Sequence, residues 1–478
     1  MKYRVISVVL FFVSGSCLFA QLRPFPQNVN YPYGYKTSEI SADDVQSAYN
    51  RWKGKFIKEC NGMYRVCTDD EGETRSEGMG YGMLLSAYFG EKGVFDSLFA
   101  FYKSKRTSQA LNLMAWKVSC AGITDYGSAT DGDLDVAFAL IIAHYQWEEP
   151  PIEDYLTEAR NILSILQNDY FFTCGGSVYT MSPGCNTVHW GGCALTDISY
   201  YTPAYFKVFA YVTQDGFWDD VANDAYTILY NGTNSSTGLV PDWQSYDGVP
   251  GGDPPSGRDD YYHYDACRVP WRMALDYLWN GDVDARDWCI EISDFANGIG
   301  ASGIRDGYEL DGTVVGSYNN SSFVGGFAVG GMSHSQTMVD NFASRLLTLD
   351  GVGWDDQYFN FSLRCLYMLV LTGNFWDPLS PAGIEETDSL PEGFNLAQNY
   401  PNPFHTVTTI EYSISEASHV RLKIYDISGR HIKTLVDKKI PAGKYAARLE
   451  ADDLLPGVHF YQLETDKNRI KKRMLLLK

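Results

Sequence analysis

Apolar residues recur with the spacing of α-helices from about residue 42 to residue 373. The pattern predicts about twelve helices, which come in pairs joined by short connections or by long loops rich in Gly, Ser and Asn. They cover residues 42–54, 77–90, 92–104, 131–147, 152–168, 202–213, 216–230, 264–279, 283–298, 322–332, 334–348 and 353–372. Paired helices in this number suit an all-α (α/α)6 barrel, although periodicity alone indicates only a large all-α domain.

Two long loops interrupt the helices, near residues 170–200 and 231–263. Both are rich in Gly, Tyr, Trp, Asp and Pro, as in the run from Val240 to Trp243. Loops of this length are commonly functional. In a barrel enzyme they would form the walls of a substrate groove.

The pattern changes after Trp376. Residues 379–392 have the composition of a linker, and beyond them apolar and polar residues alternate in short runs separated by turn residues, which is typical of β-strands. The spacing predicts a small all-β sandwich over residues 393–478. The larger helical domain then spans residues 21–378.

The first 20 residues resemble a cleaved signal peptide. Lys2 and Arg4 precede an apolar run, and small residues lead to Ala20. This run is too short for a convincing membrane span, and no later stretch reaches the roughly 18 apolar residues of a transmembrane helix. We therefore expect export without a transmembrane span.

Charge and cysteine content narrow the class further. The net charge of −21 argues against binding to nucleic acids or anionic membranes. Of the 10 cysteines, those after residue 20 suggest disulfides in an exported protein, with Cys60/Cys67 and a pair among Cys174, Cys185 and Cys193 as the plausible bonds. Metal ligation is the weaker alternative, because no Cys-x-x-Cys occurs. The cysteines after residue 20 number nine, which is odd, so at least one thiol stays free, and we expect Cys267 or Cys365 to be free.

Three acidic segments stand at or near predicted helix starts. They are the runs from Ser76 to Met83, from Ala129 to Asp135, and from Tyr264 to Trp271. At helix starts, backbone N–H groups point outward and a loop can meet a cleft. Cleavage of a glycosidic bond needs two carboxyl groups that face each other across a sugar.

All three segments resemble the motifs of glycoside hydrolase family 8. The similarity runs from about Tyr35 to about Trp376 in the family's order, and the only departure in the middle segment is Val136, where Ile or Met is usual. The resemblance implies an (α/α)6 barrel and an inverting, endo-acting enzyme for β-1,4-glucans, xylans or chitosan. It implies no metal and no cofactor.

Glu77 is the candidate general acid, a role that needs a pKa raised by apolar surroundings or by neighbouring carboxylates. A lone Glu at this position would more simply be a helix-start charge. Asp265 is the candidate general base, with Tyr264 beside it and Arg268 one helical turn away. The alternative is a structural Asp–Arg pair. An Asp in this motif resembles the branch of the family that holds cellulases and several xylanases.

Asp131 completes the catalytic candidates. By resemblance it would hydrogen-bond the distorted sugar at the cleavage subsite, while Asp133 and Asp135 are interpreted as helix N-terminal charges. A Ca²⁺ loop is disfavoured, because a helical run follows directly. Trp116 matches a family tryptophan that stacks on a sugar.

Weaker candidates for the groove are Tyr201 and Tyr205, for which core packing is an equal alternative. His189 and Trp190 are ambiguous. The remaining histidines form no cluster with a nucleophile.

The end of the chain resembles a second family. The run from Asn399 to Phe404 and the basic strand from Arg469 to Lys478 are similar to the C-terminal sorting domain of the type IX secretion system. Partners are then the secretion machinery and a polysaccharide, and the protein is secreted or held at the cell surface. A carbohydrate-binding sandwich is the alternative for this module.

The leading hypothesis is a monomeric, secreted endo-β-1,4-glucanase. An endo-xylanase or a reducing-end xylanase would use the same acid, base and fold with different groove walls. A chitosanase is less favoured, because its base lies elsewhere. From another class, a non-catalytic glycan-binding protein of the cell surface would be expected to have lost one of Glu77, Asp131 and Asp265.

Overall fold

The computed structural model describes residues 21–147, 154–251, 260–380 and 394–477, apart from single residues or pairs in the last range, namely 400–401, 405, 415–416, 428–429, 442, 452–453 and 466. The predicted signal peptide and most of the predicted linker lie outside the described residues. The chain divides into two compact units, Met1–Leu379 and Ser380–Lys478. The domain boundaries after residues 378 and 392 stay predictions.

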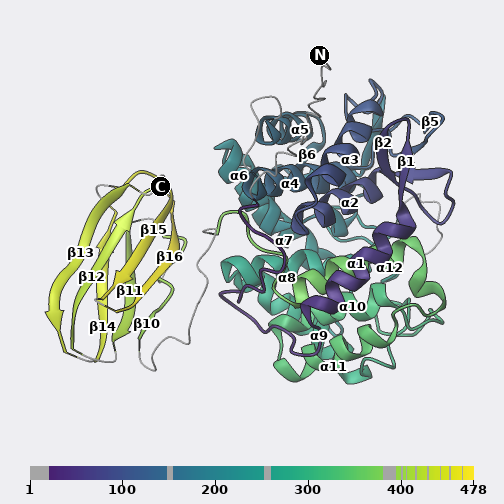
Figure 1. The fold of residues 1–478 in the computed structure, drawn as a ribbon. Coiled ribbons are helices and arrows are strands. Elements are labelled where there is room, and N and C mark those ends of the chain that lie inside the picture. The colour runs from purple at the N-terminus through teal and green to yellow at the C-terminus, as the bar shows by residue number, and fades with distance from the viewer. Residues whose placement is uncertain are drawn as a thin grey trace, which may run out of the picture. The chain divides into compact units, whose positions relative to one another are not determined.

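The first unit is built from paired helices (Figure 1). The helices are α1 Ala42–Phe56, α2 Ser76–Tyr88, α3 Lys92–Ser104, α4 Thr130–Gln146, α5 Tyr155–Asp169, α6 Pro203–Thr213, α7 Phe217–Gly232, α8 Val269–Asn280, α9 Val283–Ile299, α10 Ser321–Gly330, α11 Gln336–Thr348 and α12 Tyr358–Leu371. Each lies where the apolar periodicity predicts a helix.

Burial separates the helices into an inner and an outer ring. In α2, α4, α10 and α12 nearly every residue is buried, whereas odd-numbered helices such as α5 and α9 bury only one face. A helix that is apolar on all sides belongs inside a large core. Each even-numbered helix packs against an odd-numbered neighbour, and α12 packs on α2, which closes the ring (Figure 1). The (α/α)6 barrel is confirmed.

The start of α8 differs from the sequence prediction. The pattern places the helix start at residue 264, but residues 266–268 form a single 3-10 turn, η2, and α8 begins at Val269. Pro270 explains the difference, because proline has no N–H and favours the first turn of a helix. Asp265 therefore lies in the connection before the helix.

Short strands decorate the barrel. They are β1 Ile57–Cys60, β2 Met63–Val66, β3 Glu73–Arg75, β4 Lys117–Ser119, β5 Ile123–Asp125, β6 Phe171–Cys174, β7 Val178–Met181, β8 Gly184–Asn186 and β9 Val188–Trp190. Except for the three-stranded sheet β3-β4-β5, they form antiparallel hairpins. The predicted loop at 170–200 is thus two hairpins followed by a 3-10 turn, η1 Ile198–Tyr200.

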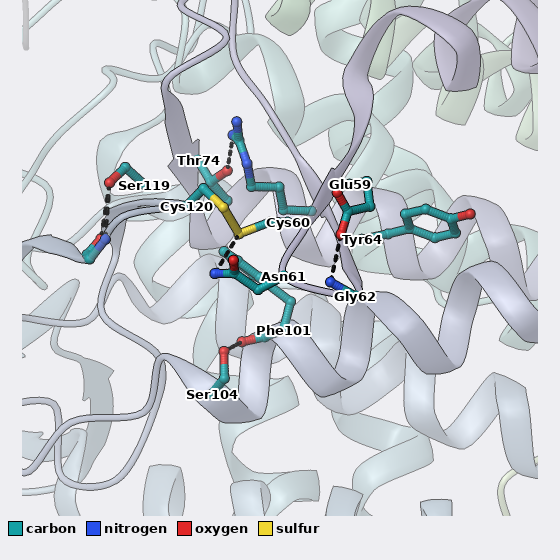
Figure 2. Close-up of a disulfide and its surroundings, with 12 residues drawn as sticks. Glu59, Cys60, Asn61, Gly62, Tyr64, Thr74, Phe101, Ser104, Ser119 and Cys120 are labelled. Atoms are coloured by element: carbon teal, nitrogen blue, oxygen red, sulfur yellow. Dashed lines mark hydrogen bonds between the residues drawn. A yellow bond between two sulfur atoms is a disulfide. The ribbon is translucent and has the colours of Figure 1, made fainter.

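Two disulfides tie these decorations together. Cys60 at the end of β1 is bonded to Cys120, just after β4 (Figure 2), and Cys174 is bonded to Cys193. The second bond was among the predicted pairs. The predicted Cys60/Cys67 bond is wrong, because the tight β1–β2 hairpin turns Cys60 toward the β4–β5 segment and leaves Cys67 as a buried free thiol. Cys267 and Cys365 are free, as expected.

The second unit is a β-sandwich of two antiparallel sheets. One has the order β10-β11-β14 and the other β13-β12-β15-β16. The strands are β10 Asn395–Leu396, β11 Val407–Ile414, β12 Ser418–Tyr425, β13 His431–Ile440, β14 Gly443–Glu450, β15 Gly457–Glu464 and β16 Arg469–Leu476. Their inward residues form one separate apolar core, which confirms the predicted all-β module.

The motif at the start of this module holds the last strand. Asn402 accepts a hydrogen bond from the backbone N–H of Leu475 at 2.7 Å, and Phe404 forms backbone hydrogen bonds with Leu475 and Leu477. Asn399 is buried and donates to the Thr408 hydroxyl at 2.9 Å. The motif residues that the structure describes thus join the two ends of the sandwich.

Candidate active site

Glu77 lies in the first turn of α2. The N–H of the preceding residue, Ser76, donates to the carbonyl of Trp116 at 2.9 Å, which links the helix start to the tryptophan segment. The Tyr358 hydroxyl donates to Glu77 Oε1 at 2.9 Å. Gly78 makes room for this contact, because a Cβ at residue 78 would lie 2.6 Å from that hydroxyl oxygen.

Two other glycines let α2 and α4 approach each other closely. A Cβ on Gly80 would lie 2.7 Å from the Cβ of Asp135, and a Cβ on Gly132 would lie 2.6 Å from the backbone of Ser76. Real side chains do not reach such distances, so both positions require glycine. The close contact brings the helix starts together, and with them Glu77 and Asp131.

Arg268 joins the acidic segments. Its Nη1 donates to Asp131 Oδ2 at 2.9 Å and to Glu77 Oε2 at 3.3 Å, while its Nη2 donates to Asp265 Oδ1 at 2.9 Å and to Asp197 Oδ2 at 3.4 Å. The guanidinium is 1% exposed. A planar fork with several donors suits this role, because it can contact carboxylates on separate edges.

A second hydrogen-bond donor contacts the Asp265 carboxylate, and further hydrogen bonds hold the backbone on both sides of it. Trp243 Nε1 donates to Asp265 Oδ2 at 3.0 Å. Asp242 Oδ1 accepts from the N–H groups of His263 and Ala266, on both sides of Asp265. The side chain of Asp265 is 34% exposed. Its carboxylate is therefore held by hydrogen bonds and still accessible to water.

The pKa of Glu77 is raised to about 7. Burial is the largest cause, and the negative charge of Asp131 adds to it, whereas Arg268 and the Tyr358 hydroxyl lower the value. Desolvation disfavours the charged form of a carboxyl group. Glu77 therefore keeps a substantial protonated fraction near neutral pH, as a proton donor must.

Asp133 and Asp135 are buried rather than being solvated helix-start charges. Asp133 accepts a hydrogen bond from Tyr102, and burial raises its pKa to about 8. Asp135 forms a bidentate ion pair with Arg272 at 2.7 and 2.8 Å. The interpretation of both as helix N-terminal charges is corrected, because α4 belongs to the inner ring and its first turn is covered.

The aromatic candidates divide into two groups. Trp116 and Tyr264 are partly exposed, and the Tyr264 hydroxyl donates to Asp306 Oδ2 at 2.9 Å. Tyr201 and Tyr205 are 0% and 1% exposed. Tyr205 stacks on Phe138 of α4 at 3.6 Å between ring centroids, which favours the core-packing alternative for both tyrosines.

Several residues of the site have no separate signal in the sequence. Tyr358 contacts Glu77, Asp197 contacts Arg268, and Asp242 holds the backbone beside Asp265, yet all three stand outside the acidic motifs. Burial and the charge of Asp265 raise the pKa of Asp197 and that of Asp242 well above the usual range. For Asp242 the sequence offers one weak signal, the Pro-Asp-Trp run, which makes the second long loop rich in aromatic and acidic residues.

The two long loops meet beside Asp265. Trp190, at the end of β9, is 43% exposed, and its ring lies 5.5 Å from that of Trp243 between centroids. Cys193 of one disulfide follows Trp190 closely in sequence, and Cys120 of the other follows Trp116. Each disulfide thus braces a segment that carries a tryptophan of the site.

Within the part of the chain that the structure describes, no group of three or more His, Cys, Asp or Glu side chains has the arrangement of a metal site. Among those same residues, no helix is both long enough and apolar enough to cross a bilayer.

Glu77 is a partly protonated carboxyl group whose side chain is 18% exposed, and Asp265 is a more open carboxylate on the same arginine. Together they provide what glycosidic bond hydrolysis requires. The double ring of helices and this site define a glycoside hydrolase. Comparison with known proteins places it more narrowly: the chain belongs to glycosyl hydrolases family 8, whose model matches residues 25–373.

The most similar relatives include two proteins named endoglucanases. Endoglucanase 2 of Ruminiclostridium josui is 36% identical over 366 residues, which cover 74% of this chain and 77% of that protein. Endoglucanase A of Acetivibrio thermocellus is 37% identical over 374 residues, covering 74% and 75%. Among solved structures, an apo β-1,3-1,4-glucanase from Paenibacillus sp. X4 matches with a TM-score of 0.68 and 30% identity, over 75% of this chain and 100% of that one.

The C-terminal module is also assigned. Residues 398–477 match the secretion system C-terminal sorting domain. The predicted sorting domain is therefore confirmed, and the protein is exported by the type IX pathway to the cell surface or the medium.

Proposed function

We propose that this enzyme is an endo-β-1,4-glucanase that hydrolyses with inversion, with Glu77 as general acid and Asp265 as general base. The observation that carries the proposal is the single buried guanidinium of Arg268, which contacts both carboxyl groups and Asp131. The relatives named endoglucanases support a glucan as substrate.

The proposed roles follow from the different surroundings of the two carboxyl groups. Glu77, with a pKa of about 7, gives its proton to the departing glycosidic oxygen. Asp265 accepts two hydrogen bonds that stabilise its ionised form. Its partly exposed carboxylate then accepts a proton from the attacking water. Water then attacks the anomeric carbon from the face opposite the leaving group, which inverts the anomeric configuration.

Asp131 supports the acid and the sugar. Its charge helps to keep Glu77 protonated, and by family resemblance its carboxylate binds the distorted sugar at the cleavage point. Trp116, Tyr264 and Trp190 would stack on neighbouring sugars, since ring faces bind the apolar faces of sugars. The monomer stays a prediction.

A substrate panel tests the proposal. Purified enzyme is offered carboxymethylcellulose, mixed-linkage β-glucan, xylan and chitosan, and NMR follows the first-formed anomer. We expect the fastest hydrolysis on the two glucans and an α-anomer as the first product. Preference for xylan would favour the xylanase alternative, a β-anomer would contradict inversion, and no hydrolysis of any polymer would favour a glycan-binding protein.

The activity is expected to fall as pH rises through about 7. Glu77 acts only when protonated, and its raised pKa places the loss of the proton near that pH. The measurement is kcat/KM against pH on a soluble β-glucan. Because the charge of Asp131 raises the pKa of Glu77, Asp131→Asn should shift the alkaline limb to lower pH as well as slowing the enzyme. An alkaline limb that stays in place would contradict this coupling.

A further inference from the structure

Two large aromatic side chains of the barrel stand exposed as a pair. Tyr318 is 52% exposed and Trp354 is 53% exposed, and their ring centroids lie 5.8 Å apart at an interplanar angle of 47°. They come from different segments, the connection before α10 and the 3-10 turn before α12 (η4 Gly353–Asp356). Single exposed rings are common on proteins, whereas a paired, partly open surface of two rings suggests a ligand.

Hydrogen bonds hold the backbone under both rings. The N–H groups of Ser317 and Tyr318 donate to Asp306 Oδ1 at 2.7 and 2.8 Å. The carbonyl of Trp354 accepts from Asn360 Nδ2 at 3.1 Å. The two segments are joined to each other, because Ser321 N donates to Asp355 Oδ1. The rings are therefore presented by a fixed frame, which lowers the entropic cost of binding.

The same frame reaches the active site at two points. Asp306, which holds Tyr318 through Oδ1, accepts the hydroxyl of Tyr264 through Oδ2, and Tyr264 adjoins Asp265. Four residues after Trp354, Tyr358 donates its hydroxyl to Glu77. The ring pair is thus continuous with the residues that position both catalytic candidates.

We propose that Tyr318 and Trp354 form a distal sugar-binding subsite beyond Tyr264, where a glucosyl unit of the bound polysaccharide stacks on the rings. The inference rests on the proposed function and adds to it a contact made only by long substrates. The occupant is the same polysaccharide chain that passes the cleavage point, because the frame leads from the rings to Tyr264. Stacking on aromatic faces is worth roughly a three- to tenfold change in affinity for one ring.

The experiment compares long and short substrates in the full-length enzyme. Tyr318→Ala, Trp354→Ala and the double variant are assayed on mixed-linkage β-glucan and on an aryl cellobioside that ends at the cleavage point. For the polymer we expect KM to rise about three- to tenfold in each single variant and further in the double variant, with kcat nearly unchanged. For the aryl cellobioside, kcat/KM should equal that of the wild type.

Tyr35→Ala is the matched control. Tyr35 is 43% exposed, and its backbone N–H bonds to Met332, after the end of α10, whereas Tyr318 precedes the start of that helix. This variant should leave KM for both substrates unchanged. Trp354→Phe keeps a flat ring and should recover most of the affinity for the polymer.

Three results would overturn the subsite. The first is an unchanged KM for the polymer in the double variant. The second is an equal loss on the polymer and the aryl cellobioside, and the third is the same rise in KM in Tyr35→Ala. A wild-type enzyme that hydrolyses no glucan would instead refute the proposed function, so the two failures are distinguishable.

Discussion

Replacing Glu77 by Gln is expected to slow hydrolysis of β-glucan about 10²- to 10⁴-fold, and replacing Asp265 by Asn is expected to do the same. The first variant has no proton to give to the leaving oxygen, and the second has no base for the attacking water. Initial rates on mixed-linkage β-glucan measure both losses. Binding of oligosaccharides should persist, because Trp116 and Tyr264 are untouched.

The two variants should differ on an activated substrate. An aryl or fluoride leaving group departs with little protonation, so Glu77→Gln should recover part of its rate on such a substrate and Asp265→Asn should recover little. The opposite pattern would mean that the acid and the base are exchanged. Small and equal losses on the polymer would place the chemistry elsewhere.

A carboxyl group outside the site provides the control. Glu158 on α5 pairs with Arg106 at 3.1 Å and is 32% exposed. Glu158→Gln makes the same side-chain exchange as Glu77→Gln, yet it should retain near wild-type activity on both substrates.

Apolar periodicity alone predicts a large all-α domain, and the family resemblance adds the (α/α)6 barrel, whose inner and outer helices differ in pattern. A fully apolar run such as Val136 to Ala143 in α4 predicts an inner helix, and a one-sided pattern predicts an outer one. The start of α8 was misplaced, because apolar residues continue through the connection and only Pro270 marks the boundary. Local pattern therefore predicts elements well and their first residue less well.

The candidate site was predictable only as far as its motifs extend. Glu77, Asp131 and Asp265 stand in short segments with glycine, whose role becomes clear once Gly80 and Gly132 are seen at the contact of two helices. Asp197 stands in no such motif. Its role was not predictable, because it contacts Arg268 from a turn 71 residues away in the chain.

The disulfide of Cys60 with Cys120 was missed for a similar reason. The partners are 60 residues apart in sequence, and only the three-dimensional fold brings the end of β1 to the segment after β4. Nearness in sequence favoured Cys67, but the register of the β1–β2 hairpin places Cys60 opposite Met63 and carries Cys67 beside Phe56, at the other end of β1. A short spacing therefore predicts a bond only when the local backbone brings the two Cys side by side.

Replacing Arg268 by Met is expected to destabilise the barrel by about 3–5 kcal/mol at neutral pH and to abolish activity. The guanidinium is 1% exposed and contacts four carboxyl groups, so its loss leaves buried negative charge without a cation. Asp265 also loses one of the two side chains that donate to it, while Trp243 remains. Urea unfolding measures the stability, and rates on β-glucan measure the activity.

The stability lost in Arg268→Met should be larger at high pH than at low pH. Arg268 lowers the pKa of Glu77 and that of Asp197, so its removal raises both in the folded state. A folded state that binds more protons than the unfolded state is favoured at low pH, and its stability falls as pH rises through the carboxyl range. Arg268→Met should therefore be closer to wild type in stability at pH 5 than at pH 7.5.

Two further variants separate charge from geometry. Arg268→Lys keeps a cation but lacks the planar fork, so it should regain part of the stability and little of the activity. Arg286→Met breaks an exposed pair with Asp287 and should cost less than about 1 kcal/mol at either pH. If Arg268→Met were as stable as the wild type at pH 7.5, or if Arg268→Lys hydrolysed β-glucan at the wild-type rate, the shared guanidinium would not be what holds the acid and the base in place.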